Sequence, residues 1–179
     1  MPVSTGYTRL LEALSEPRRA HSLRVAELAK KIAEKNGLDP EKAYLAGLLH
    51  DVAKELPEAE LLRLAPPENP VEEAHPLVLH GRAARVLAER AGVRDPEVLA
   101  AIEGHVVGVA PDFPLGIAVY LADLADPGRG YNQDLLERAL KGELLSAYEE
   151  GVRRKVAYLE ARGIPVHPFT REVLRRLAG

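Results

Sequence analysis

The sequence contains no cysteine among its 179 residues. Disulfides, thiolate metal sites and cysteine nucleophiles are therefore excluded. No apolar stretch approaches the roughly 20 residues that would span a membrane. The first residues also lack the basic start and apolar core of a secretory signal. We therefore expect a cytoplasmic protein with no membrane partner.

The sequence also lacks a basic excess, because its formal net charge is −3 with the histidines neutral. A broad nucleic-acid footprint usually needs such an excess, so we expect no nucleic-acid partner. Local basic groups remain able to hold a small phosphorylated ligand. Amide residues are scarce too, with one glutamine and three asparagines beside 14 prolines, and this composition weakly favours a thermophilic source.

The alternation of apolar and polar residues that is typical of strands is nearly absent. Apolar residues instead recur at spacings of three and four, which is typical of helices. Proline and glycine clusters separate the helical segments. The sequence predicts an all-α fold, a single domain over residues 1–179 with a helical-bundle core. The expected helices cover 3–14, 17–36, 40–53, 57–64, 76–91, 95–106, 114–125, 131–140, 142–162 and 168–178, with loops at 65–70 and 108–114.

Polar side chains fall on the apolar face of five different predicted helices. They are His21, His50, His80, His105 and Asp123, and Asp51 directly follows His50. A lone histidine on such a face is usually a core residue bonded to a neighbour. That explanation would have to hold six times, although burying each group without compensation costs several kcal/mol. A metal centre in the middle of a helical bundle satisfies all six groups together.

The ligand chemistry fits a pair of transition-metal ions. Imidazole and carboxylate suit iron, manganese, zinc, cobalt or nickel without any thiolate. Six protein ligands are too many for one catalytic ion that keeps an open position, and suit two ions with water between them. Adjacent helical residues point about 100° apart. His50 can therefore bind one ion while the Asp51 carboxylate bridges to a second.

Five blocks of the chain resemble the HD-domain superfamily of metal-dependent phosphohydrolases. Within it they resemble, in sequence and order, the YqeK family of symmetrical diadenosine tetraphosphate hydrolases. The blocks are HSLRVAELA (21–29), AGLLHDVAK (46–54), HG (80–81), AIEGHVVG (101–108) and VYLADLADPGR (119–129). The resemblance covers roughly residues 17–162. It implies an all-helical fold, a di-iron centre, a homodimer, and cleavage of diadenosine tetraphosphate to two ADP.

The resemblance also implies which residue holds which ion. By position, one metal would be held by His21, His50, Asp51 and Asp123, and the other by Asp51, His80 and His105. Manganese or another transition metal is an alternative to iron. The chain departs from the family pattern at Val106 and Val107, where the family has threonines, and at Asp126, where it has glutamate. If the threonines contact substrate, affinity or specificity differs in this chain.

Two neighbouring metal ions can lower the pKa of a shared water, polarise a phosphoryl oxygen and stabilise the leaving oxygen. We expect Lys54, one helical turn after Asp51, to assist catalysis as a phosphate contact, against a solvated lysine at a helix end. Arg129 is the second expected phosphate contact, against a structural pair with Asp126. Further candidate substrate contacts are Arg24 and Arg82, otherwise surface or second-layer charges, and Asp126, which would orient Arg129 or meet a ribose.

The other candidates are weaker. We interpret His75 as a loop or supporting residue and His167 as structural, and expect Tyr120 and Tyr131 to pack in the core or stack on adenine. Two alternative functions remain: an HD-type hydrolase of another nucleotide, such as a deoxynucleoside monophosphate, and a non-catalytic nucleotide sensor or interaction module. His80 and His105 favour two metals, and a decayed enzyme would have lost at least one ligand.

Overall fold

The computed structural model describes residues 5–179, and no strand occurs among them, which confirms the predicted all-α fold class. Eleven α-helices and two 3₁₀ turns follow one another along the described chain. They are α1 (Thr5–Glu12), α2 (Glu16–Lys35), α3 (Pro40–Leu49), α4 (Glu58–Leu64), α5 (Pro70–Ala74), η1 (Pro76–Leu79), α6 (His80–Arg90), α7 (Pro96–Gly104), α8 (Pro114–Leu124), η2 (Pro127–Arg129), α9 (Gln133–Leu140), α10 (Leu144–Ala161) and α11 (Pro168–Ala178).

Five α-helices start at a polar cap with proline in their first turn, and α11, capped by His167, is one of them. The cap side chain accepts a backbone N–H of the first turn, and proline fixes the backbone angle that a first helical turn needs. The caps of α2, α3, α5 and α7 are Ser15, Asp39, Asn69 and Asp95. These signals explain why most helix starts lie within a residue or two of their predicted positions.

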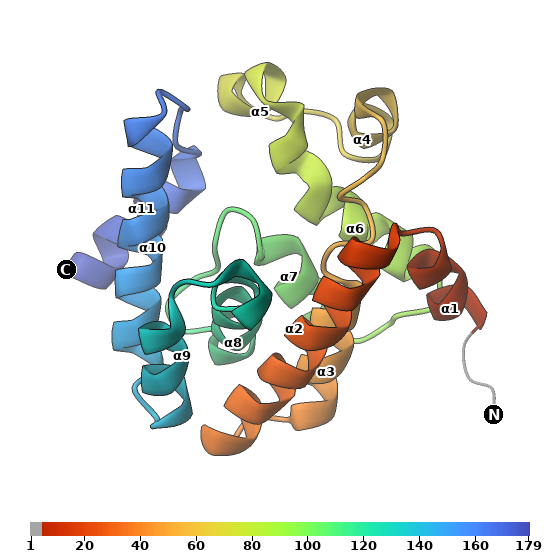
Figure 1. Ribbon diagram of the computed structural model, residues 1–179. Coiled ribbons are helices and arrows are strands. Elements are labelled where there is room, and N and C mark those ends of the chain that lie inside the picture. The colour runs from red at the N-terminus through yellow and green to blue at the C-terminus, as the bar shows by residue number, and fades with distance from the viewer. Residues whose placement is uncertain (1–4) are drawn as a thin grey trace.

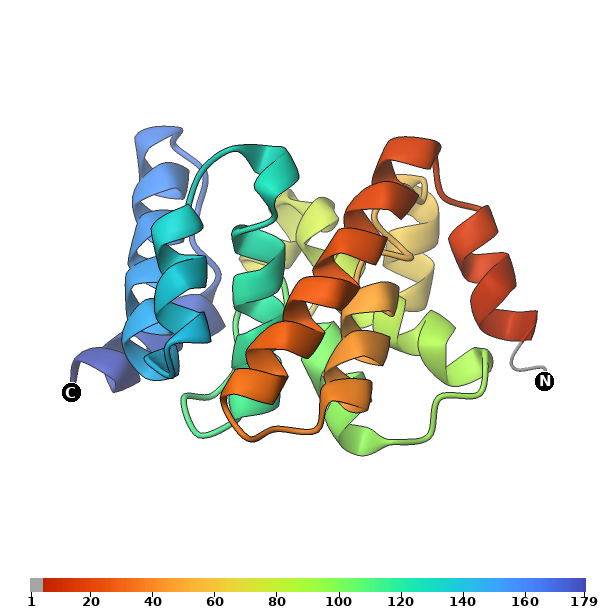
Figure 2. The ribbon, with the colours of Figure 1, turned by 60° about the horizontal axis from the view of Figure 1, so that its bottom comes forward.

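The helices pack around a shared apolar interior. Helix α2 lies against α3 and α8, α7 lies against α3, α6 and α8, and α10 covers α8 and α9 (Figure 1). Figure 2 shows α10, α9, α8 and α2 following one another across the molecule, with the two termini at opposite ends. Among the described residues, no helix is both long and apolar enough to cross a membrane.

Two glycines allow close helix contacts that matter for the site. A Cβ on Gly47 of α3 would lie 2.9 Å from the Ala26 Cα of α2, nearer than real side chains approach backbone. A Cβ on Gly81 of α6 would lie 2.5 Å from the Glu103 carbonyl oxygen of α7. The first contact brings the helices of His21 and His50 together, and the second does the same for His80 and His105.

Three predicted helix boundaries that lie at candidate histidines are wrong. Helix α3 ends at Leu49 instead of 53, and α7 ends at Gly104 instead of 106, so His50 and His105 lie just beyond helix ends. Residues 76–79 form the 3₁₀ turn η1, and α6 begins only at His80.

The sequence prediction also missed α5 and η2, which are short elements inside segments expected to be loops or breaks. The expected helix at 3–14 ends at Glu12, and its first two residues lie outside the described part of the chain.

Candidate metal centre

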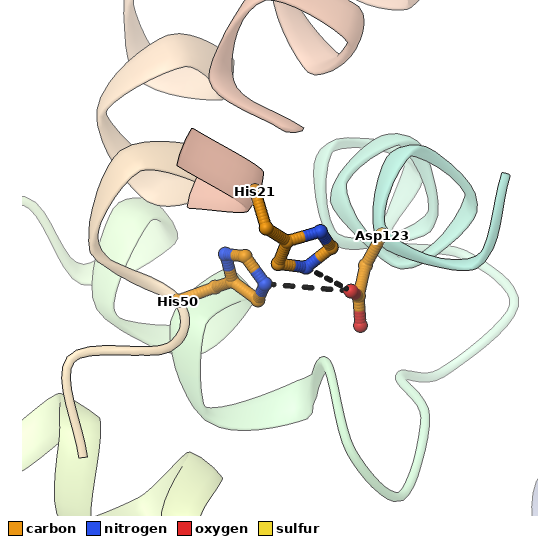
Figure 3. Close-up of side chains that lie close together, drawn as sticks. All are labelled: His21, His50 and Asp123. Atoms are coloured by element: carbon orange, nitrogen blue, oxygen red, sulfur yellow. Dashed lines mark hydrogen bonds and ion pairs between the residues drawn. The ribbon is translucent and has the colours of Figure 1, made fainter. Parts of the chain in front are cut away.

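The six expected ligands converge at the centre of the bundle, from α2, the ends of α3 and α7, the start of α6, and α8. The four histidines and Asp51 are at most 6% exposed. On the α2 side, His21 Nε2 lies 2.9 Å and His50 Nε2 3.4 Å from Asp123 Oδ1 (Figure 3). The potential ligand atoms of these three residues all lie within 4.8 Å of one another.

A second group lies on the side of α6 and α7. The Nε2 atoms of His80 and His105 are 3.1 Å apart. Asp51 Oδ1 lies 3.6 Å from His80 Nε2 and 3.3 Å from His105 Nε2. Potential ligand atoms of His50, Asp51 and His105 also lie within 4.8 Å of one another, so this group adjoins the first.

Asp51 stands between the two groups. Its Oδ1 faces His80 and His105, whereas its Oδ2 lies 3.6 Å from His21 Nε2 and 3.4 Å from His50 Nε2. The two oxygens of one buried carboxylate are thus directed at different pairs of imidazoles. This is the arrangement that a bridging carboxylate requires.

Three of the imidazoles are held by their own chain. The Nδ1 atoms of His50, His80 and His105 lie 2.6, 2.6 and 2.8 Å from the carbonyl oxygens three residues earlier. A carbonyl only accepts, so each Nδ1 carries a hydrogen and donates it. In a neutral ring the lone pair is then on Nε2, which points into the centre and is free to bind a metal.

These Nε2 atoms lack a satisfactory protein partner. His50 Nε2 is fully buried and makes no hydrogen bond within the described residues, although one carboxylate oxygen each of Asp51 and Asp123 lies 3.4 Å away. Between His80 and His105, two lone pairs face each other in the neutral rings at 3.1 Å. Both arrangements are costly on their own, and a cation bound by these nitrogens removes both costs. The residues therefore fit a metal of the class that imidazole and carboxylate prefer.

The charges within the cluster shift its pKa values in opposite directions. Burial opposes charge on His50, but Asp51 and Asp123 overcome it and raise the pKa of His50 to about 10. Burial, with help from His105 and Lys54, lowers the pKa of His80 to about 3. Burial opposes charge on Asp51 too, yet neighbouring imidazoles hold the pKa of this carboxyl well below its ordinary value. Asp51 is therefore ionised, which a bridging role would require.

Asp126 supports His21 instead of orienting Arg129. Its carboxylate accepts the His21 Nδ1–H at 2.6 Å and two bonds from the Arg24 guanidinium at 2.8 and 3.0 Å. Despite burial, Arg24 and His21 lower the pKa of Asp126 to about 2. At 1% exposure, Asp126 is also too buried to meet a ribose. Its expected substrate role is thus replaced by a chain from Arg24 through Asp126 to His21.

Two arginines contact the ligand carboxylates directly. Arg129 donates to Asp123 Oδ1 at 3.0 Å and to the Asp123 carbonyl at 2.9 Å, so its ion-pair partner is Asp123 and not Asp126. Arg18 donates to Asp51 Oδ2 at 2.9 Å, a contact that the sequence analysis missed. Its place three residues before His21, on the same face of α2, was the available signal.

A cavity of about 450 Å³ opens onto this centre. It is lined by Asp51, Lys54, His80, His105, Val106, Asp123, Leu124, Arg129, Tyr131, Asn132, Arg154, Lys155 and Tyr158. Lys54 and Arg129 therefore lie where a phosphate contact is expected. Val106 also lines this cavity, whereas Val107 lines a separate one, so of these two valines only Val106 adjoins the candidate metal centre.

The remaining candidates lie elsewhere. Arg82 lines the separate cavity and donates to Glu72 and to the Pro66 carbonyl, which leaves it away from the metal-site lining. His167 bonds Glu72 and caps α11, in line with a structural role. Tyr120 packs edge-on against Tyr148 in the core.

His75 ends α5 and precedes η1, and it is not among the residues that line the metal-site cavity. Tyr131 is 59% exposed at that cavity, which is the position a stacking residue needs.

The fold and the site together define a helical protein with a histidine–aspartate centre assembled from five segments. The HD domain model matches residues 18–128. The chain therefore belongs to the HD-domain family. A Staphylococcus aureus relative named symmetrical bis(5'-nucleosyl)-tetraphosphatase is 34% identical, covering 91% of this chain and 88% of the relative. A Bacillus subtilis protein of the same name is 29% identical over 89% of this chain and 88% of its own length.

A crystal structure from Clostridium acetobutylicum shares the whole architecture. It is described as a "predicted HD superfamily hydrolase involved in NAD metabolism", and it superposes with a TM-score of 0.90 at 30% identity, covering 97% of this chain and 95% of the other. A Mycoplasma pneumoniae relative, a probable nicotinate-nucleotide adenylyltransferase/Ap4A hydrolase, is 37% identical over 79% of this chain. This chain spans 44% of that longer protein.

Proposed function

We propose that this protein is a metal-dependent phosphohydrolase that cleaves dinucleoside tetraphosphates symmetrically, giving two ADP from diadenosine tetraphosphate. The observation that carries the proposal is the position of Asp51, whose two oxygens face two separate pairs of histidines. The names of the full-length bacterial relatives supply the substrate class.

The proposed ligands are divided between two ions. His21, His50 and Asp123 would hold one ion, His80 and His105 the other, and Asp51 would bridge them. Iron is the proposed metal, with manganese or another transition metal as the alternative. When bound, such a pair supplies Lewis acidity and makes hydroxide available from water at neutral pH.

The protein's own residues position the substrate and neutralise its charge. Lys54 and Arg129 line the cavity beside the ligands, and cations there offset the negative charge of a polyphosphate. Arg18 fixes Asp51, and Arg24 acts through Asp126 on His21. In the overall reaction the oxygen of water joins one inner phosphorus, the central P–O bond breaks, and the second ADP leaves with that electron pair.

The test is product analysis on purified, metal-loaded protein. Diadenosine tetraphosphate should give ADP as its sole nucleotide product, separated by anion-exchange chromatography. ATP together with AMP would mean attack at an outer phosphorus and would overturn the symmetrical assignment. Elemental analysis of protein purified without chelator identifies the metal, and light scattering tests the proposed homodimer.

A further inference from the structure

One wall of the metal-site cavity comes from beyond the family match. The HD domain model ends at residue 128, whereas Arg154, Lys155 and Tyr158 on α10 line the same cavity as Asp51 and His105. Helix α10 packs on α8, which carries Asp123, and this contact places the three α10 residues beside the candidate metal centre.

The cavity holds more positive charge than its lining can balance. Arg129 is paired with Asp123, and Arg154 is paired with Asp134 and Glu150. The side chains of Lys54 and Lys155, in contrast, form no ion pair or hydrogen bond within residues 5–179. Two ammonium groups therefore line the cavity with no carboxylate paired to either of them, and such groups can bind a polyanion.

The surroundings of Lys155 support this reading. Burial lowers the pKa of Lys155, and although Asp123 opposes the shift, Lys54 and Arg129 add to it by repulsion. An ammonium crowded by like charges gains most when an anion enters among them. A phosphate chain that reaches Lys54, Arg129 and Lys155 would relieve the repulsion among all three.

Tyr158 follows Lys155 by three residues, so the two side chains lie on one face of α10, with Cβ atoms about 5–6 Å apart. Its ring is 51% exposed although it is large and apolar. The Arg162 guanidinium lies 3.9 Å from the ring centroid, covering one face and holding the ring in place. Tyr158 also lines the cavity, where a half-exposed ring can receive a flat partner.

We propose that α10 forms the nucleotide-holding wall of the cavity, with Lys155 binding a phosphate and Tyr158 stacking on the attached nucleobase. This deepens the proposed function by assigning a binding place to one half of a dinucleoside polyphosphate. Stacking on an aromatic ring tolerates any base, so the wall selects for a nucleotide without requiring adenine.

Fragments of the ligand test the two roles separately. Calorimetry on metal-loaded protein would measure binding of inorganic pyrophosphate, adenosine and ADP. Lys155→Met should weaken pyrophosphate and ADP about tenfold and leave adenosine unchanged, while Lys155→Arg restores affinity. Tyr158→Ala should weaken adenosine and ADP about tenfold and leave pyrophosphate unchanged, while Tyr158→Phe binds like the parent protein.

Arg153→Met is the matched control, because it removes one positive charge from an exposed position on the same helix. It should bind all three probes normally. Unchanged pyrophosphate affinity in Lys155→Met, or unchanged adenosine affinity in Tyr158→Ala, would overturn the inference. If the parent protein binds as expected but does not hydrolyse diadenosine tetraphosphate, the proposed function fails alone. If it hydrolyses and both variants bind normally, only the α10 inference fails.

Discussion

Two clusters in this protein, each containing a buried carboxylate and histidine, behave differently. In the metal centre, His50 Nε2 has no hydrogen-bond partner within the described residues, and two other imidazoles face each other. In the second cluster, Glu72 accepts bonds from His167 at 2.8 Å, Arg82 at 3.0 Å and the Glu68 backbone N–H at 2.8 Å. The first cluster leaves imidazole nitrogens that a cation would satisfy, whereas in the second cluster both oxygens of the Glu72 carboxylate already accept hydrogen bonds.

The comparison shows that residue type alone does not make a site. His167 accepts the Phe169 backbone N–H through Nδ1, so its Nε2 carries the hydrogen that Glu72 receives. In its neutral, metal-binding form His50 has the opposite arrangement, with Nδ1 donating to a carbonyl and Nε2 left with a lone pair. Nδ1 is bound to the backbone in both rings, and whether it accepts or donates decides whether Nε2 is a donor or a metal ligand.

The largest expected effect, on both metal content and hydrolysis rate, comes from replacing Asp51, the proposed bridging ligand. Asp51→Ala should lose bound metal and more than about 100-fold of the hydrolysis rate, since even supporting residues of metal sites change affinity or activity by 10–100-fold. Metal content by elemental analysis and the rate of ADP release measure it. Asp112→Ala, an exposed aspartate outside the cavity, is the control. Full metal content and rate in Asp51→Ala would refute the two-ion site.

A smaller effect on metal affinity is expected at Asp126, which contacts the candidate ligand His21 and not the metal itself. Asp126→Asn keeps the shape of the side chain but weakens its hold on the His21 Nδ1–H, so metal affinity should fall about 10–100-fold. Competition with a chelator measures this affinity. Asp112→Asn should leave it unchanged, and equal affinities for Asp126→Asn and the parent protein would show that the His21 contact does not matter.

The smallest effect is expected at Glu72 in the second cluster, where a substitution should change only the free energy of unfolding. Glu72→Gln can place an amide N–H₂ against the His167 Nε2–H, which should cost about 1–3 kcal/mol in free energy of unfolding. Metal content and hydrolysis rate should stay normal. A loss of metal in Glu72→Gln would show that the two clusters are coupled.

The same variant has a defined pH dependence. Although burial opposes its charge, His167, the Glu68 N–H and Arg82 lower the pKa of Glu72 below its ordinary value of 4.5. A carboxyl with a lowered folded-state pKa stabilises the fold above its unfolded-state pKa, and this contribution is lost as the pH falls through the folded-state pKa. The Tm difference between the parent protein and Glu72→Gln should therefore be full near pH 7 and shrink below about pH 4.5. A difference that is constant with pH would contradict the assignment.

The sequence predicted the helices and the ligand cluster because both depend on periodicity. A polar group on an apolar stripe must meet a partner in the interior, and six such groups meet each other. Helix ends were harder to predict, because His50 and His105 bond back to carbonyls of their own last turn. The contacts of Arg18 with Asp51 and of Arg24 with Asp126 depend on how the helices cross. The spacing of apolar residues along one helix does not predict that crossing. The same limit explains why Arg82 and Asp126 were expected at the substrate.

The helix ends at the centre have an electrostatic consequence of their own. Helices α3 and α7 both terminate at a candidate ligand, His50 and His105. The carboxyl end of a helix carries the equivalent of roughly half a negative charge. Two macrodipoles thus direct their negative ends toward the same point. The backbone itself makes this point attractive to cations, the reverse of the helix amino ends that hold phosphate in many nucleotide-binding proteins.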